Sequence, residues 1–246
     1  MKIGSICALA VILWALTAAT GYAEEVDCNM CHPDLSQGAV VHPAIGMGCR
    51  SCHSGIDASE TPHKMTTAFP KGLSSETADV CYSCHDKAKF YAPTIHAPVG
   101  IGICTACHNP HRSENEKLLV ASKQTICFNC HDTAKFTGKK TVHDPVKAGL
   151  CLECHTAHAS NNEYLIVSKG NILCRKCHPR VEKEAHAVVG FKAAGHPVRG
   201  KSDPRRKGKT FECLSCHSPH TSDWGRLFRY KAENPYELCI YCHDTF

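Results

Sequence analysis

The chain has 246 residues and a formal net charge of +5, and its nineteen cysteines and eighteen histidines accompany only seventeen Phe, Tyr and Trp residues. The hydrophobic fraction of 43% includes the cysteines, so Leu, Ile, Val and Phe are too few to fill the interior by themselves. The composition therefore argues against a domain packed only by apolar side chains, and we expect another group to occupy the core.

The N-terminal segment is typical of a secretory signal. Lys2 precedes a short apolar stretch from Ile6 to Leu16, and small residues then lead to Ala23. We predict that residues 1–23 are a signal peptide cleaved before Glu24, with an uncleaved N-terminal anchor as the alternative. No other segment is long and apolar enough to cross a bilayer. The sequence therefore predicts an exported protein without a membrane span in its mature chain, in the periplasm, or alternatively extracellular or associated with the outer membrane.

Apart from Cys7, every cysteine belongs to a Cys-x-x-Cys pair, and a histidine directly follows each of the nine pairs. The pairs are Cys28/Cys31, Cys49/Cys52, Cys81/Cys84, Cys104/Cys107, Cys127/Cys130, Cys151/Cys154, Cys174/Cys177, Cys213/Cys216 and Cys239/Cys242. The histidines that follow them are His32, His53, His85, His108, His131, His155, His178, His217 and His243.

Three interpretations of these pairs compete. The spacing between pairs suits four-cysteine zinc sites, and disulfides are common in exported chains. Neither interpretation explains a histidine after every pair. Covalent haem attachment does, because the two thiols bond the porphyrin vinyl groups and the adjacent imidazole is the proximal iron ligand. The sequence predicts nine covalently attached haem c groups.

The remaining histidines equal the motif histidines in number, which predicts that they are the distal iron ligands. They are His42, His63, His96, His111, His143, His158, His186, His196 and His220. Methionine is the alternative distal ligand, with Met65 close in sequence to His63. The count favours bis-histidine ligation of every iron.

The spacing of the second set divides it into three classes. His111, His158 and His220 each follow a motif histidine by three residues. Because side chains at i and i+3 lie on the same side of a turn, each of these should ligate a haem other than the adjacent one. A second class comprises His42, His96 and His143. Their distance from the preceding motif histidine would let a loop fold back over the haem of that motif. A third class (His63, His186 and His196) is irregularly placed.

The motifs recur with a period near 47, since Cys104 and Cys151 are 47 residues apart, as are Cys127 and Cys174. We predict that residues 24–246 form a nine-haem region of about four doubled repeats, with Cys239 as a terminal site. Frequent Pro and Gly predict a mostly irregular fold with short α-helices and little or no β-structure, whose core is the packed haem chain.

Two further expectations concern local structure and size. Asn234 and Pro235 predict a helix start before Cys239, and Ser75 and Thr77 predict a cap before Cys81. A chain of this length treated as a compact sphere would place neighbouring irons about 17 Å apart.

The run Cys104–His111 followed by Cys127–His131 resembles the doubled CXXCH unit of multihaem cytochromes. Cys151–His178 and Cys213–His243 match the unit as well, and Cys49–His85 fits loosely because His63 is displaced. The resemblance implies bis-histidine haems of low potential and respiratory electron transfer. Such families also include periplasmic halves of porin–cytochrome conduits and subunits of extracellular filaments.

These observations predict an electron-transfer protein that is not an enzyme. Its partners would be other cytochromes, quinol-linked proteins or outer-membrane conduits, with no nucleic acid. The alternatives are a filament subunit, or a reductase of a small nitrogen or sulfur oxyanion with one open iron near His63, His186 or His196; no Cys-x-x-Cys-Lys motif occurs. The basic stretch from Arg199 to Lys209 could dock an acidic redox partner or form a solvated loop that neutralises haem propionates.

Overall fold

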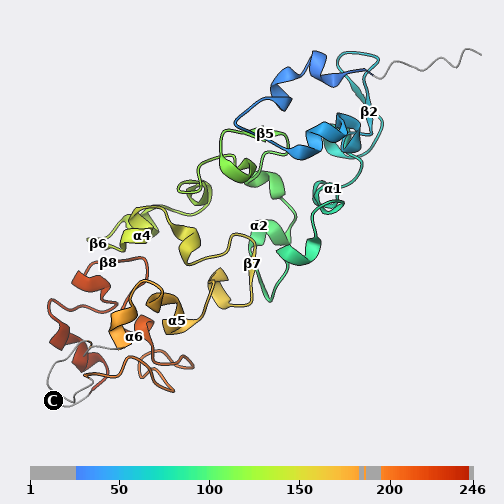
Figure 1. The fold of residues 1–246 in the computed structure, drawn as a ribbon. Coiled ribbons are helices and arrows are strands. Elements are labelled where there is room, and N and C mark those ends of the chain that lie inside the picture. The colour runs from blue at the N-terminus through green and yellow to red at the C-terminus, as the bar shows by residue number, and fades with distance from the viewer. Residues whose placement is uncertain (1–25, 183–185, 187–194, 244–246) are drawn as a thin grey trace, which may run out of the picture.

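The computed structural model describes residues 26–182, 186 and 195–243. The predicted signal peptide, residues 1–23, lies outside them. Figure 1 shows an elongated body in which the chain advances from one end to the other, and consecutive segments remain neighbours. The expectation of a compact sphere is therefore wrong, because each repeat packs mainly against the next one in the sequence.

Helices are short in the described part of the chain. The α-helices are α1 (Thr77–Tyr82), α2 (Ala97–Gly100), α3 (Ala134–Thr137), α4 (Asp144–Lys147), α5 (Gly170–Arg175) and α6 (Cys213–Cys216). Fourteen 3₁₀ segments accompany them in that part, and the longest spans Pro235–Tyr241. α2 and α4 each have a proline in the first turn, and the chain leaves them through Gly102 and Gly149 at φ of 75° and 69°. Proline at the start and glycine with positive φ after the end limit these helices to about one turn.

The strands have two residues each and form two-stranded antiparallel ladders. They are β1 (Val40–Val41), β2 (Ile56–Asp57), β3 (Lys64–Met65), β4 (Thr94–Ile95), β5 (Arg112–Ser113), β6 (Thr141–Val142), β7 (Ala159–Ser160) and β8 (Thr221–Ser222). β2 pairs with β3 inside the first repeat, whereas β1 with β5, β4 with β7 and β6 with β8 join segments from successive repeats. The expectation of a mostly irregular fold with short helices and little β-structure is confirmed.

Local start signals were predicted with mixed success. The side chain of Asn234 accepts a hydrogen bond from the Tyr236 amide at 3.0 Å, and the 3₁₀ segment begins at Pro235, as predicted. The predicted caps for α1 are wrong. Its N-cap position is Glu76, which makes no side-chain cap hydrogen bond, and Thr77 is already the first helical residue.

A conventional hydrophobic core is nearly absent. Among the described residues, Phe228 and Ala232 are the buried hydrophobic residues, and no large side chain there is fully buried. The buried polar residues include Ser113, Ser160 and Ser222, which hold turns rather than fill an interior. Apolar packing of side chains therefore contributes little to this fold. Within the described ranges, no helix is both long and apolar enough to cross a membrane.

Candidate functional site

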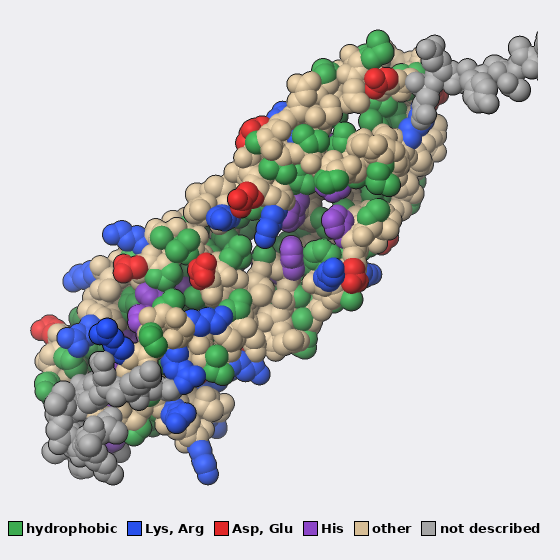
Figure 2. All heavy atoms as spheres, in the orientation of Figure 1, with side chains coloured by type: hydrophobic (Ala, Val, Ile, Leu, Met, Phe, Trp, Pro, Cys, Tyr) green, Lys and Arg blue, Asp and Glu red, His purple; other side chains and the backbone are tan. Residues whose placement is uncertain are grey.

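The structure brings all eighteen histidines together in nine facing pairs. In each pair, one imidazole belongs to a Cys-x-x-Cys-His motif and the other to the second set, with ring centroids 5.9–6.3 Å apart. The pairs are His32 with His63, His85 with His42, His53 with His111, His131 with His96, His108 with His158, His178 with His143, His155 with His220, His217 with His186 and His243 with His196. Figure 2 shows some of these histidine side chains inside hollows on one face of the body.

The separation of the rings fits a shared metal atom. An imidazole nitrogen lies about 1.1 Å from its ring centre, and a metal–imidazole bond is about 2 Å long. Two imidazoles on opposite sides of one metal therefore have ring centres about 6 Å apart. Two cysteines directly precede one imidazole of every pair, so each pair offers the complete donor set of haem c: two thiols for the vinyl groups and two imidazoles for the iron.

The regular histidines pair across repeats. His111, His158 and His220 face His53, His108 and His155, so each lies opposite a motif histidine of the preceding unit. This agrees with the expectation that they do not face the motif histidine three residues before them. As a result, each His-x-x-His segment connects two neighbouring pairs.

The expectation for the second class is wrong. His42, His96 and His143 do not fold back to the preceding motif but face His85, His131 and His178, in the second motif after them. The physical reason is the strand before each histidine. β1 leads into His42 and pairs with β5, which directly follows His111. The pairing carries His42 forward along the body and away from His32.

The inter-repeat strands place histidines of neighbouring pairs side by side. The amide of His42 donates to the carbonyl of His111 at 2.8 Å. The same bond joins His96 to His158 at 2.8 Å and His143 to His220 at 2.9 Å. One backbone hydrogen bond at each junction thus fixes two histidines that face different motif histidines.

The irregular histidines lie at the two ends of the array. His63 faces His32, the motif histidine of the first site, from a segment inserted between the second and third motifs. At the other end, His186 and His196, both from the insertion before α6, face His217 and His243. Their irregular sequence placement therefore reflects the ends of the repeat array.

Four motif histidines are oriented by a turn that the sequence did not reveal. The Nδ1 atoms of His53, His108, His155 and His217 lie 2.8–2.9 Å from the carbonyl oxygens of Lys71, Lys117, Tyr164 and Arg226. Nδ1–H donates this bond, which leaves Nε2 free to bind a metal. The four carbonyl residues have φ of 55–57°. Such a conformation is unfavourable for residues with a side chain, so the surrounding turn must hold it in place.

A serine or threonine holds each of these turns, buried in the last three and half-buried in the first. The hydroxyl groups of Thr67, Ser113, Ser160 and Ser222 donate to the carbonyls of Leu73, Leu119, Ile166 and Phe228. A sequence signal exists, since in the last three repeats the carbonyl residue follows the motif histidine by nine positions. That signal becomes interpretable only once the turn is seen.

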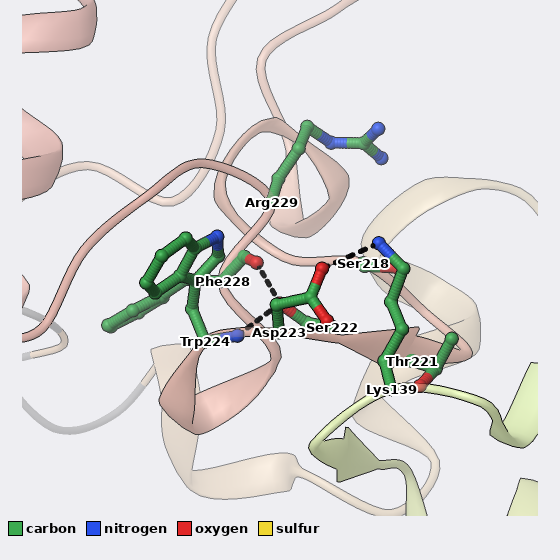
Figure 3. Close-up of a pocket in the computed structure, with 8 residues that line it drawn as sticks. All are labelled: Lys139, Ser218, Thr221, Ser222, Asp223, Trp224, Phe228 and Arg229. Carbon is green, nitrogen blue, oxygen red and sulfur yellow. Dashed lines mark hydrogen bonds and ion pairs between the residues drawn. The ribbon is translucent and has the colours of Figure 1, made fainter.

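Figure 3 shows the last of these turns at the junction of β6 and β8. The hydroxyl of Ser222 donates to the Phe228 carbonyl and accepts from the Trp224 amide, and Lys139 forms an ion pair with Asp223 at 3.1 Å. The Ser222 bonds hold the turn itself, and the ion pair joins it to the segment that leads into β6.

Burial favours the neutral form of several imidazoles. Burial, followed by the facing His53, lowers the pKa of His111. Burial, followed by the facing His155, likewise lowers the pKa of His220. Neutral imidazole is the form that binds metals. Burial therefore favours the form of these side chains that could bind a metal.

The cysteine pairs of successive motifs lie beside one another. Burial, followed by the neighbouring thiol of Cys104, raises the pKa of Cys81 to about 11. Burial and the thiol of Cys151 raise the pKa of Cys127 to about 11. Each of these contacts joins the end of one repeat to the start of the next, so the sites follow one another in sequence order.

Four of the cysteines that the sequence assigned to haem attachment are exposed rather than enclosed by the protein, whereas the other described cysteines are half-buried. The exposed cysteines are Cys31, Cys84, Cys130 and Cys177, each the second cysteine of its motif.

For four of the half-buried second cysteines the covering element is the histidine-orienting turn, whereas Cys242 is half-buried although its motif is not one of the four with this turn. Where the turn follows a motif, one of its backbone amides donates a hydrogen bond of 2.7–2.9 Å to the carbonyl of the motif's second cysteine, and the turn covers that cysteine. This occurs at Cys52, Cys107, Cys154 and Cys216. The motifs of the four exposed cysteines are not among those whose histidines this turn orients. Burial does not test haem attachment, so the attachment role of all eighteen cysteines stays a prediction from the motifs.

In the described part of the chain, the cysteine thiols form neither disulfides nor direct metal sites. None of the eighteen cysteines there forms a disulfide. Within those residues, no group of three or more His, Cys, Asp or Glu side chains is placed to hold a metal ion directly. The recurring unit is instead a facing pair of imidazoles next to two thiols.

Comparison with protein families gives a specific match. The model of the doubled CXXCH motif matches residues 42–90, 96–136, 143–183 and 203–246, which together are more than half of the chain. The chain belongs to the doubled CXXCH motif family. It is a multihaem c-type cytochrome, a class that carries covalently attached haem outside the cytoplasm and generally transfers electrons. No curated protein matches it.

The four matches also define the repeat more closely. Each contains two motifs, and the last one includes both Cys213 and Cys239. The motif that stands outside the doubled units is therefore Cys28–His32 at the start of the array, rather than Cys239–His243 at its end.

Proposed function

We propose that the protein binds nine haem c groups, each between a motif histidine and the histidine that faces it, and that it transfers electrons in anaerobic or extracellular respiration. The one-to-one pairing of all eighteen histidines supports this proposal most directly. When bound, the haem groups supply reversible one-electron chemistry. The polypeptide supplies their attachment, orientation and spacing.

The facing pairs support a carrier rather than a reductase. A reductase needs an iron position that a substrate can reach, whereas every motif histidine here has a second imidazole opposite it. This includes the three irregular histidines that the sequence suggested as the location of an open site: His63, His186 and His196.

The contacts between neighbouring sites support a continuous array. Backbone hydrogen bonds such as that from His42 to His111 hold the histidines of adjacent sites together. Thiol contacts such as that between Cys81 and Cys104 join the successive cysteine pairs. Electrons would enter and leave at redox partner proteins, in the periplasm or at the cell surface, and nucleic acid has no role in this proposal.

Spectroscopy of the purified, oxidised protein tests the proposal. Mass spectrometry should give nine haems, and EPR should show only low-spin iron that is unaffected by cyanide or nitrite. A high-spin fraction near one ninth would contradict complete bis-histidine ligation and favour a reductase.

The pairing itself is tested with His111, which should serve the site of Cys49 and Cys52. His111→Ala should convert about one ninth of the haem to high spin, and His111→Met should instead raise the potential of one haem. In a Cys49→Ala/Cys52→Ala background, which lacks that haem, His111→Ala should have no further effect. In a Cys104→Ala/Cys107→Ala background, its effect should persist. The reverse pattern would show that His111 serves the adjacent site.

A further inference from the structure

The longest insertion of the last repeat forms a basic hairpin with a defined conformation. Gly200 and Phe211 exchange backbone hydrogen bonds of 3.0 and 3.2 Å, and the amide of Asp203 donates to the carbonyl of Lys209 at 2.8 Å. The chain turns at Gly208, whose φ is 76°. We refer to Gly200–Phe211 as the basic hairpin.

One arginine of the hairpin points inward and fixes it to the last repeat. Nε of Arg206 lies 2.6 Å from the carboxylate of Asp203, whose side chain is only 1% exposed. The Arg206 guanidinium also donates to the Thr210 carbonyl at 3.3 Å and to the Ser215 hydroxyl at 3.2 Å. Because the Asp203 carboxylate is paired with Arg206, it does not neutralise the basic side chains on the outer face of the hairpin.

The other basic side chains point outward. Lys201, Arg205 and Lys207 in the hairpin, and Arg199 directly before it, are exposed. Within the described part of the chain, no acidic side chain forms an ion pair with any of these four. Figure 2 shows Lys and Arg side chains gathered over the C-terminal end of the body. The hairpin is thus a preformed surface whose four outward cations have no acidic partner among the described residues.

This surface lies beside the last two histidine pairs. His196 precedes the hairpin by four residues, and its ring faces that of His243 at 6.3 Å and contacts Phe211 at 5.8 Å. At the other end of the hairpin, Arg206 donates a hydrogen bond to Ser215, which lies two residues before His217. The positive surface and the C-terminal end of the array are therefore built from the same segment.

We propose that the basic hairpin is the docking surface for an acidic redox partner protein, which exchanges electrons with the C-terminal end of the array. The inference rests on the proposed function. In the exchange, one electron leaves the reduced partner, which becomes oxidised, and reduces the docked protein, with no bond formed or broken. A positive surface at this position attracts a negatively charged partner and orients it over the terminal sites.

Charge-neutral variants of the holoprotein test the proposal, with an acidic [2Fe–2S] ferredoxin as the probe. Lys201→Gln/Lys207→Gln removes two charges from the hairpin. Lys135→Gln/Lys140→Gln is the matched control, because it removes two exposed lysines that precede β6 and lie outside the hairpin. Calorimetry of both oxidised proteins at low ionic strength measures binding without electron transfer. Stopped-flow mixing with reduced probe then measures the rate of electron transfer.

The hairpin variant should bind about tenfold more weakly and accept electrons about tenfold more slowly, while the control stays within about twofold, and the difference should vanish at high salt. Equal losses in both variants, or none, would overturn the proposal. It would also be overturned if the hairpin variant only shifted haem potentials, or only abolished self-association in sedimentation velocity. Binding of two oxidised proteins requires no particular haem ligation, so failure here is distinguishable from failure of the proposed function.

Discussion

The buried carboxylate of Asp203 should stabilise the basic hairpin by a measurable amount. Its side chain is 1% exposed and lies 2.6 Å from Nε of Arg206. It also accepts hydrogen bonds from the backbone amides of Arg205 and Arg206 at 2.8 and 2.9 Å. Replacement by asparagine keeps the size and one acceptor oxygen but removes the charge, so Asp203→Asn isolates the electrostatic contribution.

The size of this contribution follows from the pKa. Burial acts to raise the pKa of Asp203, but hydrogen bonds from Ser215, Arg206 and the backbone amides outweigh burial and lower the pKa from 3.8 to about 2. A group whose folded-state pKa is lowered stabilises the fold above its unfolded-state pKa, and the stabilisation is lost as the pH falls through the folded-state value. Asp203 should therefore contribute about 2 kcal/mol at neutral pH, and this should be lost between about pH 4 and pH 2.

Limited proteolysis of the holoprotein provides the assay. The hairpin is rich in trypsin sites, and cleavage reports how often it opens. At pH 7, Asp203→Asn should be cleaved about 30-fold faster than the unmodified protein. Asp223→Asn is the control. Its ion pair with Lys139 is 49–51% exposed, and such pairs contribute at most about 1 kcal/mol. Equal cleavage of the Asp203→Asn variant and the unmodified protein would refute the reasoning.

Two further predictions concern what holds the chain together. Without haem attachment, the protein should be largely unfolded by circular dichroism, since Phe228 and Ala232 are the buried hydrophobic residues of the described part; a native-like spectrum would contradict this. In the holoprotein, Ser222→Ala should lower stability by about 1–3 kcal/mol, because the Phe228 carbonyl and Trp224 amide each lose a partner. Thermal unfolding measures the loss, and Ser218→Ala in the same turn should have a smaller effect.

Much of the candidate site could be predicted from the sequence because its chemistry is local. Two thiols and an imidazole within five residues define an attachment motif wherever they occur, and nine copies require no knowledge of the fold. The mostly irregular architecture was also predictable, since frequent Pro and Gly and few large apolar residues exclude long helices and sheets. The helix start at Asn234 depends on neighbouring residues in the same way.

The remainder depended on contacts between repeats. The strands that position His42, His96 and His143 have only two residues each, which is too short for a recognisable pattern, and their partners lie in the next repeat. The turn that places the Lys117 carbonyl on His108 needs a positive φ at a lysine, which local preference disfavours. The same turn covers the second cysteine of four motifs, a difference that identical Cys-x-x-Cys-His motifs cannot reveal.

The sequence by itself determined the number, type and order of the candidate metal-binding groups, because these are properties of single residues and short spacings. Only the tertiary structure decided which histidine faces which, because that choice is made by hydrogen bonds between segments far apart in the chain.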